Sequence, residues 1–148
     1  MKNDSRDSLL WFKRAKDDLR FAQKAFEDTE PAYDLACYLS QQCAEKSLKA
    51  LLIYTGIEYP HKHQTSELVK LLPATDKTEI SNMVSPDRLA LIDEWLTAGR
   101  YPGDAPEATA DEAKDVIQSA SAIYMLVEKR ILLQDERNGL VDNYKKVD

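Results

Sequence analysis

Two histidines in one short loop are the first residues whose type suits acid–base or metal chemistry. His61 and His63 are the only histidines of the chain, and both lie in the segment IEYPHKHQ, residues 57–64. Two histidines so close can share a metal ion, but nothing nearby in the sequence completes a ligand set. Glu58 and His61 have Glu-x-x-His spacing, yet Pro60 between them indicates a loop. We therefore predict no metal site. His63 remains either a plain loop residue or a general acid–base group in a polar groove.

A second candidate is the one loop rich in both glycine and proline, GRYPGDAPEA, residues 99–108. Loops held between long helices often carry binding residues. Arg100 is suited to forming two hydrogen bonds to a phosphate, and Tyr101 is suited to stacking on a base. The alternative is a surface arginine beside a tyrosine that fills the end of a bundle.

A polar stripe on the expected second helix is the third candidate. Tyr38, Gln42, Glu45 and Lys49 fall within about 60° of arc on a helix that turns 100° per residue. Glu45 and Lys49 are four apart and can form an ion pair on a solvated face, which needs no function. The alternative is a polar seam that lies against a second subunit or lines a groove.

Familiar catalytic and cofactor patterns are absent. The sequence has no glycine-rich phosphate loop, no G-x-S-x-G and no H-E-x-x-H. We therefore predict no cofactor and no metal, and the candidate residues above must act through their own side chains.

The charge distribution limits the partners. The net charge of −6 argues against a general polyanion binder, and the excess acid lies between residues 76 and 115. Contact with nucleic acid would need a local basic patch. One face of the expected first helix is basic, although Asp17 and Glu27 interrupt it. We interpret this face as solvated, with a nucleic-acid stripe as the alternative. Its cations are Lys13, Lys16, Arg20 and Lys24.

The elements that must position these residues are helices. The chain has 148 residues, only 4 of them glycine, and few β-branched residues, which favours helix over sheet. Apolar spacing of three and four predicts helices over about 5–28, 31–55, 65–72 and 76–98, with a break near Ser85-Pro86. A last long helix opens with a capping box from Thr109 to Glu112. We predict one all-α up-and-down bundle of four to five helices over residues 1–134, followed by a polar tail over 135–148.

Two further observations bear on location. No apolar run approaches the ~18 residues that a membrane span needs, and no secretory signal is visible, so we expect no membrane contact and a cytoplasmic protein. Cys37 and Cys43 stand about 9 Å apart along one expected helix, beyond disulfide reach. We predict two buried thiols.

Several of these segments together resemble the HEPN domain, whose name stands for higher eukaryotes and prokaryotes nucleotide-binding. The resemblance covers about residues 8–133, and its most specific element is QQCAEKSLKALL. Four segments carry it in order: WFKRAKDDLRFAQKAF (11–26), YDLACYLSQQCAEKSLKALLIYTG (33–56), PHKHQTSELVKLL (60–72) and GRYPG (99–103).

The resemblance implies a helical bundle that commonly forms homodimers. It also implies either a partner nucleotidyltransferase in a toxin–antitoxin-like pair or an RNA-cleaving domain. The family's ribonucleases place a histidine four to six residues after an arginine. Neither His61 nor His63 follows an arginine in this way, and no histidine follows Arg100. The family's T-R-Y-P-D string is G-R-Y-P-G-D here, so the acid is shifted to Asp104.

Three hypotheses follow. The first is a module that binds a nucleotide or RNA phosphate and acts with a nucleotidyltransferase. Its expected binding residues are Arg100, Tyr101, Lys49, His63, Gln42, Glu45 and Asp104. The second is a metal-independent ribonuclease toxin with a rearranged site, in which His63 is the acid–base group and Arg100 holds the scissile phosphate. The third is a non-catalytic dimeric interaction module.

Overall fold

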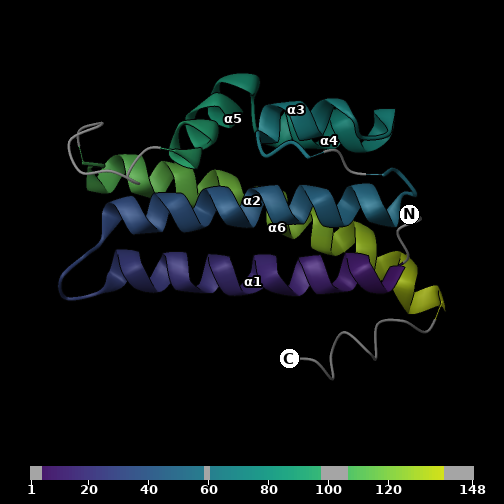
Figure 1. Ribbon diagram of the computed structural model, residues 1–148, viewed down its shortest axis with the longest axis horizontal. Helices are drawn as coiled ribbons and strands as arrows, with labels where there is room; N and C mark the ends of the chain where they lie inside the picture. Colours follow the sequence, from purple (N-terminus) through teal and green to yellow (C-terminus); the bar gives the residue numbers. More distant parts are fainter. Residues whose placement is uncertain (1–4, 59–60, 98–106, 139–148) are drawn as a thin grey trace.

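The computed structural model confirms the all-α bundle and describes residues 5–58, 61–97 and 107–138. Three long helices form the body: α1 (Ser5–Glu27), α2 (Tyr33–Tyr54) and α6 (Ala110–Asn138). Three shorter helices, α3 (Thr65–Lys70), α4 (Ala74–Met83) and α5 (Pro86–Asp93), lie on the side of α2 away from α1 (Figure 1). A short 3₁₀ turn, η1 (Glu94–Leu96), follows α5.

Local sequence signals mark three of the helix ends. Gly56 follows α2 with φ of 80°, the left-handed conformation that glycine adopts without a side-chain clash. Ser85 caps α5, where its hydroxyl accepts a hydrogen bond from the Arg88 N–H, so the fourth helical region divides into two helices as the Ser85-Pro86 pair predicts. Thr109 Oγ1 accepts from the Glu112 N–H at 3.1 Å at the start of α6. Helix α6 continues to Asn138, so the expected boundary at residue 134 lies inside this helix.

The core lies between α1, α2 and α6. Helix α2 is its centre, since fourteen of its residues are buried. Small side chains at Ala36, Cys43, Ser47 and Ala50 let the neighbouring helices approach closely. Across the bundle, the rings of Phe12 and Tyr124 stack with centroids 4.7 Å apart. The largest fully buried apolar side chains are Phe12, Leu48, Leu51, Leu52, Leu68, Ile80, Ile92, Ile123, Val84, Val127 and Ile131.

Both cysteines are free and buried, as predicted. Burial raises the pKa of the Cys37 thiol and of the Cys43 thiol, each to about 12. The thiols therefore stay protonated in the folded protein at neutral pH. None of the described helices is both long and apolar enough to span a bilayer.

Polar contacts fix the register of the long helices. The Ser8 hydroxyl donates to the Ala50 carbonyl oxygen at 2.8 Å and ties α1 to α2. The Lys46 ammonium donates to Asp18 at 2.7 Å across the same pair of helices. The Ala108 N–H donates to the Asp34 carboxylate at 2.7 Å, which holds the approach to α6 against the start of α2. These contacts keep the polar side chains of α2 in fixed positions.

Candidate functional site

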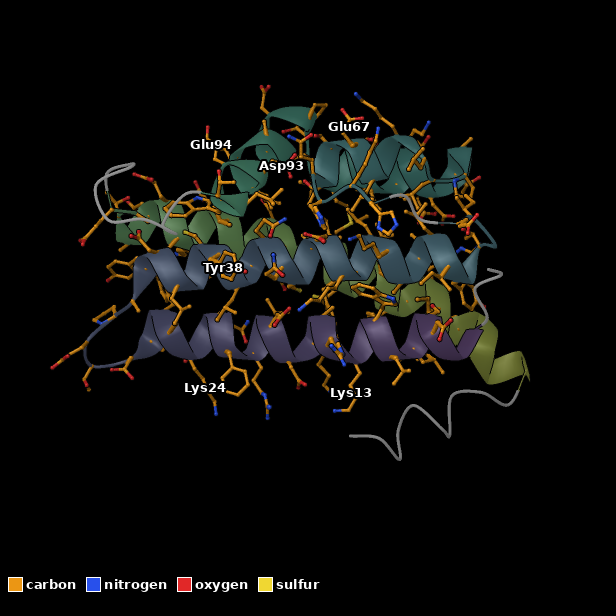
Figure 2. All side chains as sticks on the ribbon, viewed as in Figure 1. Lys13, Lys24, Tyr38, Glu67, Asp93 and Glu94 are labelled. Atoms are coloured by element: carbon orange, nitrogen blue, oxygen red, sulfur yellow. The ribbon has the colours of Figure 1, made fainter. Side chains whose placement is uncertain are left out.

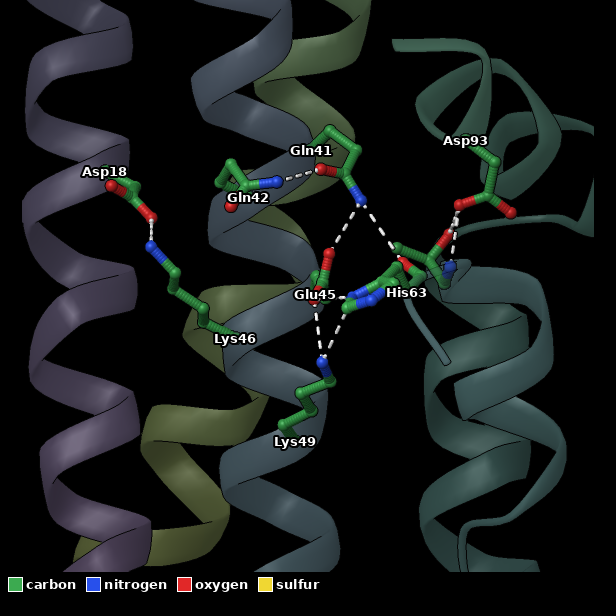
Figure 3. Close-up of polar contacts among 9 residues, drawn as sticks. Asp18, Gln41, Gln42, Glu45, Lys46, Lys49, His63 and Asp93 are labelled. Carbon is green, nitrogen blue, oxygen red and sulfur yellow. Dashed lines mark hydrogen bonds and ion pairs between the residues drawn. The ribbon is translucent and has the colours of Figure 1, made fainter. Parts of the chain in front are cut away.

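The polar stripe of α2 meets the histidine loop. The carboxylate of Glu45 accepts from Lys49 Nζ at 2.8 Å and lies 2.9 Å from His63 Nδ1, both through Oε2. Its other oxygen, Oε1, accepts from Gln41 Nε2 at 3.2 Å. Figure 3 shows Lys49 and His63 converging on Glu45, with Gln41 on the opposite side. We call these four residues the Glu45 cluster.

The cluster is buried except at the histidine. The side chains of Glu45 and Lys49 are 8% and 4% exposed, whereas that of His63 is 59% exposed. The solvated-face alternative for the Glu45–Lys49 pair is therefore wrong, because the loop before α3 covers it. An i,i+4 ion pair looks the same in sequence whether water or another element faces it, so the spacing alone could not decide this.

Hydrogen bonds to Glu45 outweigh its burial. Burial by itself would raise the pKa of Glu45, but hydrogen bonds from Lys49, His63 and Gln41 lower the pKa below the ordinary value. Glu45 is thus a carboxylate at neutral pH, and with Lys49 it forms a pair of zero formal net charge. The Lys49 ammonium also lies 5.4 Å from the centroid of the Trp11 ring.

The carboxylate sets the tautomer of His63. A neutral imidazole has one N–H and one acceptor nitrogen, and a carboxylate oxygen accepts only from the N–H. In the neutral ring, the 2.9 Å contact with Glu45 Oε2 therefore places the hydrogen on Nδ1, and the Lys49 ammonium, 3.4 Å from the same nitrogen, donates to Glu45. Nε2 is then the acceptor nitrogen of an exposed ring that a buried carboxylate orients. This is the base-and-orienter arrangement that general acid–base catalysis uses.

Gln41 joins the cluster to the backbone of the loop. Its amide nitrogen donates to Glu45 and to the carbonyl oxygen of His63, each at 3.2 Å, and its amide oxygen accepts from Gln42 Nε2 at 2.6 Å. Gln41 is fully buried. Sequence reasoning missed this residue, although its four-residue spacing from Glu45 on one helix was a usable signal. Of the predicted stripe, Gln42 reaches the cluster through Gln41, and Tyr38 is half-buried one turn away.

Asp93 of α5 anchors the histidine loop from the other side. One carboxylate oxygen accepts from the N–H and hydroxyl of Thr65, and the other accepts from the N–H and hydroxyl of Ser66, at 2.6–3.2 Å. Gln64 at the N-cap position of α3 makes no side-chain capping bond. Asp93 therefore caps α3 from another helix and fixes the backbone two residues after His63. Figure 3 shows Asp93 beside the cluster.

The remaining predicted residues divide into two groups. His61 is exposed, and no hydrogen bond joins its side chain to the described part of the chain. Arg100, Tyr101 and Asp104 lie outside the described residues. No group of three or more histidine, cysteine, aspartate or glutamate side chains in the described ranges is arranged to hold a metal ion.

The chain is thus a small all-α bundle with a buried polar cluster on its central helix. Comparison with known protein families shows which family of helical domains it belongs to. The HEPN domain family matches residues 8–130. The chain belongs to this family, as the sequence resemblance predicted.

Relatives of known name agree with this assignment. A Methanocaldococcus jannaschii protein named "Putative toxin MJ1304" is 28% identical over 133 residues, which cover 80% of this chain and 84% of that protein. The crystal structure of ST0689, described as an archaeal HEPN homologue, is 34% identical with a TM-score of 0.61 and covers 82% of this chain and 94% of that one. The crystal structure of TT1696 from Thermus thermophilus is 27% identical with a TM-score of 0.66, and the coverage is 86% and 98%.

Proposed function

We propose that this HEPN domain is a toxin-like module that binds the phosphate of a nucleotide or RNA at His63. The observation that carries the proposal is an exposed imidazole oriented by a buried carboxylate, with Nε2 directed away from Glu45. A side chain left half in water while its partners are buried is suited to contact a ligand. The toxin-related name of one relative supports the same class of function.

We assign Arg100 and Tyr101 to the proposed site because they follow Asp93 closely in the sequence. Arg100 follows Asp93 by seven positions, so its backbone lies within about 25 Å of the residue that anchors the histidine loop. In the proposal Arg100 holds a phosphate, Tyr101 stacks on a base or supports the loop, and Asp104 helps to set that loop. Lys49 supports His63 through Glu45, since its ammonium is buried.

A thermal-shift screen against nucleoside mono-, di- and triphosphates and short RNAs tests the binding proposal. A ligand at one hundred times its Kd stabilises the native state by about 2.7 kcal/mol. For a domain of this size that is a rise in Tm of roughly 5–11 °C. The rise should disappear in Arg100→Ala and His63→Ala and persist in His61→Ala, a matched exposed histidine of the same loop. A shift that survives both of the first two variants would place binding elsewhere.

A second candidate function, RNA cleavage, is favoured by the tautomer of His63. Nε2 would take the proton of a ribose 2′-hydroxyl, and the 2′-oxygen would form a bond to the adjacent phosphorus. The bond from phosphorus to the 5′-oxygen would then break, leaving a 2′,3′-cyclic phosphate and, after protonation, a 5′-hydroxyl. Mass spectrometry of RNA incubated with the protein tests this. Cyclic-phosphate ends that are lost in His63→Ala but not in His61→Ala support cleavage, and intact RNA contradicts it.

The partners are a further part of the proposal. We expect a homodimer, and we expect a small nucleotidyltransferase as the protein with which this domain pairs, in a toxin–antitoxin-like arrangement. Sedimentation velocity of the purified chain tests the first expectation, where a single species at the monomer mass would contradict it. Co-expression with a small nucleotidyltransferase from the same organism tests the second, through joint purification and relief of any growth arrest. Separate elution of the two proteins would count against the pairing.

A further inference from the structure

The outer face of α1 concentrates positive charge on an acidic protein. The helix buries Phe12, Ala15, Leu19 and Ala22 in the core, so the opposite side of the helix faces outward. We call that side the α1 outer face, and its residues are Lys13, Arg14, Asp17, Arg20, Phe21 and Lys24. Four of these are cations and one is an acid, and a second acid, the exposed Glu27, lies at the C-terminal end of the face, on a chain whose net charge is −6. Figure 2 shows Lys13 and Lys24 pointing away from α2.

An aromatic ring lies among these cations. Phe21 is 48% exposed. The guanidinium carbon of Arg20 is 4.9 Å from the ring centroid, and Lys24 Nζ is 5.5 Å from it. An exposed ring flanked by two cations offers a stacking surface and phosphate contacts side by side.

A second aromatic ring lies at the other end of the same helix. Trp11, Leu10, Arg14, Asp7 and Lys46 line a hollow of about 370 Å³ beside α1 and α2. Trp11 and Phe21 are ten positions apart, which corresponds to about 15 Å along the helix axis. Stacked nucleotides advance about 3.4 Å each along one strand, so this length matches about four of them.

The cations of the α1 outer face differ in how freely they can contact a phosphate, because some of them form ion pairs. Asp17 engages Lys13 at 3.9 Å and Arg20 at 3.5 Å, which are long, exposed contacts that compete weakly with a ligand. Arg14 and Lys24 form no ion pair with any residue in the described ranges. The acid at the centre of the face therefore neutralises at most one of the four cations.

We propose that the α1 outer face binds single-stranded nucleic acid, with bases stacked on Phe21 and Trp11 and phosphates held by Arg14, Arg20 and Lys24. A second copy of the chain is disfavoured as the occupant. A two-fold interface would place this face against itself, so that cations meet cations. The cations and Phe21 lie on the side of α1 that faces away from the core, whereas the half-buried Trp11 at the edge of the surface lies 5.4 Å from Lys49 Nζ. The inference holds even if His63 binds nothing.

Fluorescence anisotropy of a labelled twelve-nucleotide oligoadenylate tests the proposal with the full chain. Phe21→Leu keeps an apolar side chain and removes the ring, so affinity should fall about tenfold at every salt concentration. Lys24→Gln should reduce the slope of log K against log salt by about 0.7. Lys70→Gln is the matched control, since Lys70 is an exposed cation on α3, on the far side of α2 (Figure 1), and should change neither quantity. Circular dichroism checks that each variant is folded.

The other outcomes overturn the proposal. Equal loss of affinity in Lys24→Gln and Lys70→Gln, with no effect of Phe21→Leu, would mean diffuse electrostatic attraction without a stacking site. No binding at 50 mM salt would exclude the surface. A dimer that dissociates in Phe21→Leu would make the face a protein interface. Full affinity for oligoadenylate in Phe21→Leu and Lys24→Gln, together with a loss in His63→Ala, would place the strand at the His63 site and not on the α1 outer face.

Discussion

Glu45→Gln should destabilise the protein by about 3 kcal/mol, at the lower end of the range for breaking a buried ion pair. The Lys49 ammonium is 4% exposed and loses its carboxylate partner. The lower end applies because the introduced amide keeps the shape and one acceptor, and because His63 remains largely in water. For a domain of this length, about 3 kcal/mol corresponds to a fall in Tm of roughly 6–12 °C.

Urea denaturation measures this loss, and a double-mutant cycle with Lys49→Met assigns it to the pair. Removing both charges leaves neither ion buried alone, so the double variant should be more stable than the sum of the single effects predicts, by at least about 1 kcal/mol. Glu67→Gln is the control. Within the described ranges, Glu67 forms ion pairs only with the exposed Lys62 and Lys70, and Figure 2 shows Glu67 on α3. Its replacement should cost no more than about 0.5 kcal/mol.

The pH dependence gives a second measure of the same change. The pKa of Glu45 is lowered in the folded protein, so its stabilising effect is complete above the ordinary carboxyl pKa and is lost as the pH falls through the lowered value. The difference in stability between the wild type and Glu45→Gln should therefore be largest near neutral pH and should shrink below about pH 4.5. A difference that is constant with pH, or additive single effects in the cycle, would refute the role assigned to Glu45.

Three further predictions concern the elements that hold the site. Asp93→Ala removes the acceptor of four hydrogen bonds and should destabilise the protein by about 2–3 kcal/mol in urea; a change below about 0.5 kcal/mol would mean that the histidine loop does not depend on Asp93. Gly56→Ala should cost about 1 kcal/mol because φ is 80° there, and a neutral effect on Tm would show that the turn relaxes. Cys37 and Cys43 each have a pKa of about 12 when folded, so their stabilising effect is complete below the pKa of the unfolded thiols and is lost as the pH rises. Above pH 9, the free energy of unfolding of the variant with both cysteines replaced by alanine should therefore fall less steeply with pH than that of the wild type, by about 2.7 kcal/mol per pH unit. An equal dependence on pH in the two proteins would contradict this.

Most of the fold was predictable because its signals are local. Ser85-Pro86, Gly56 and the Thr109–Glu112 capping box each mark a helix end within a few residues, and the structure places helix ends at all of them. The burial of α2 was less predictable. Its polar stripe suggested one wet side, whereas the histidine loop and α3 cover that side.

The sequence allowed us to predict which side chains share one face of α2. It did not allow us to predict that they contact His63. Gln42, Glu45 and Lys49 share one face of a helix by spacing alone. Their closure against His63 depends on Asp93, whose hydrogen bonds reach residues 27 and 28 positions away in the chain. No local pattern encodes a contact of that kind. The contact of Trp11 with Lys49 was not predictable for the same reason, because the two residues lie on different helices and far apart in the sequence.

The charge balance of the Glu45 cluster limits what it can do alone. Glu45 neutralises Lys49, and the ammonium is buried, so the cluster orients an imidazole without offering a cation to an anionic ligand. Cations that hold a phosphate must therefore come from other residues. Arg100, seven positions after Asp93 in the chain, is the cation that the proposed function assigns to this role, and the α1 outer face offers Arg14, Arg20 and Lys24. Under the proposed function, Arg100 and His63 hold a ligand with one phosphate, whereas a strand with several phosphates also uses α1. The length of the nucleic acid that binds would therefore distinguish the two surfaces.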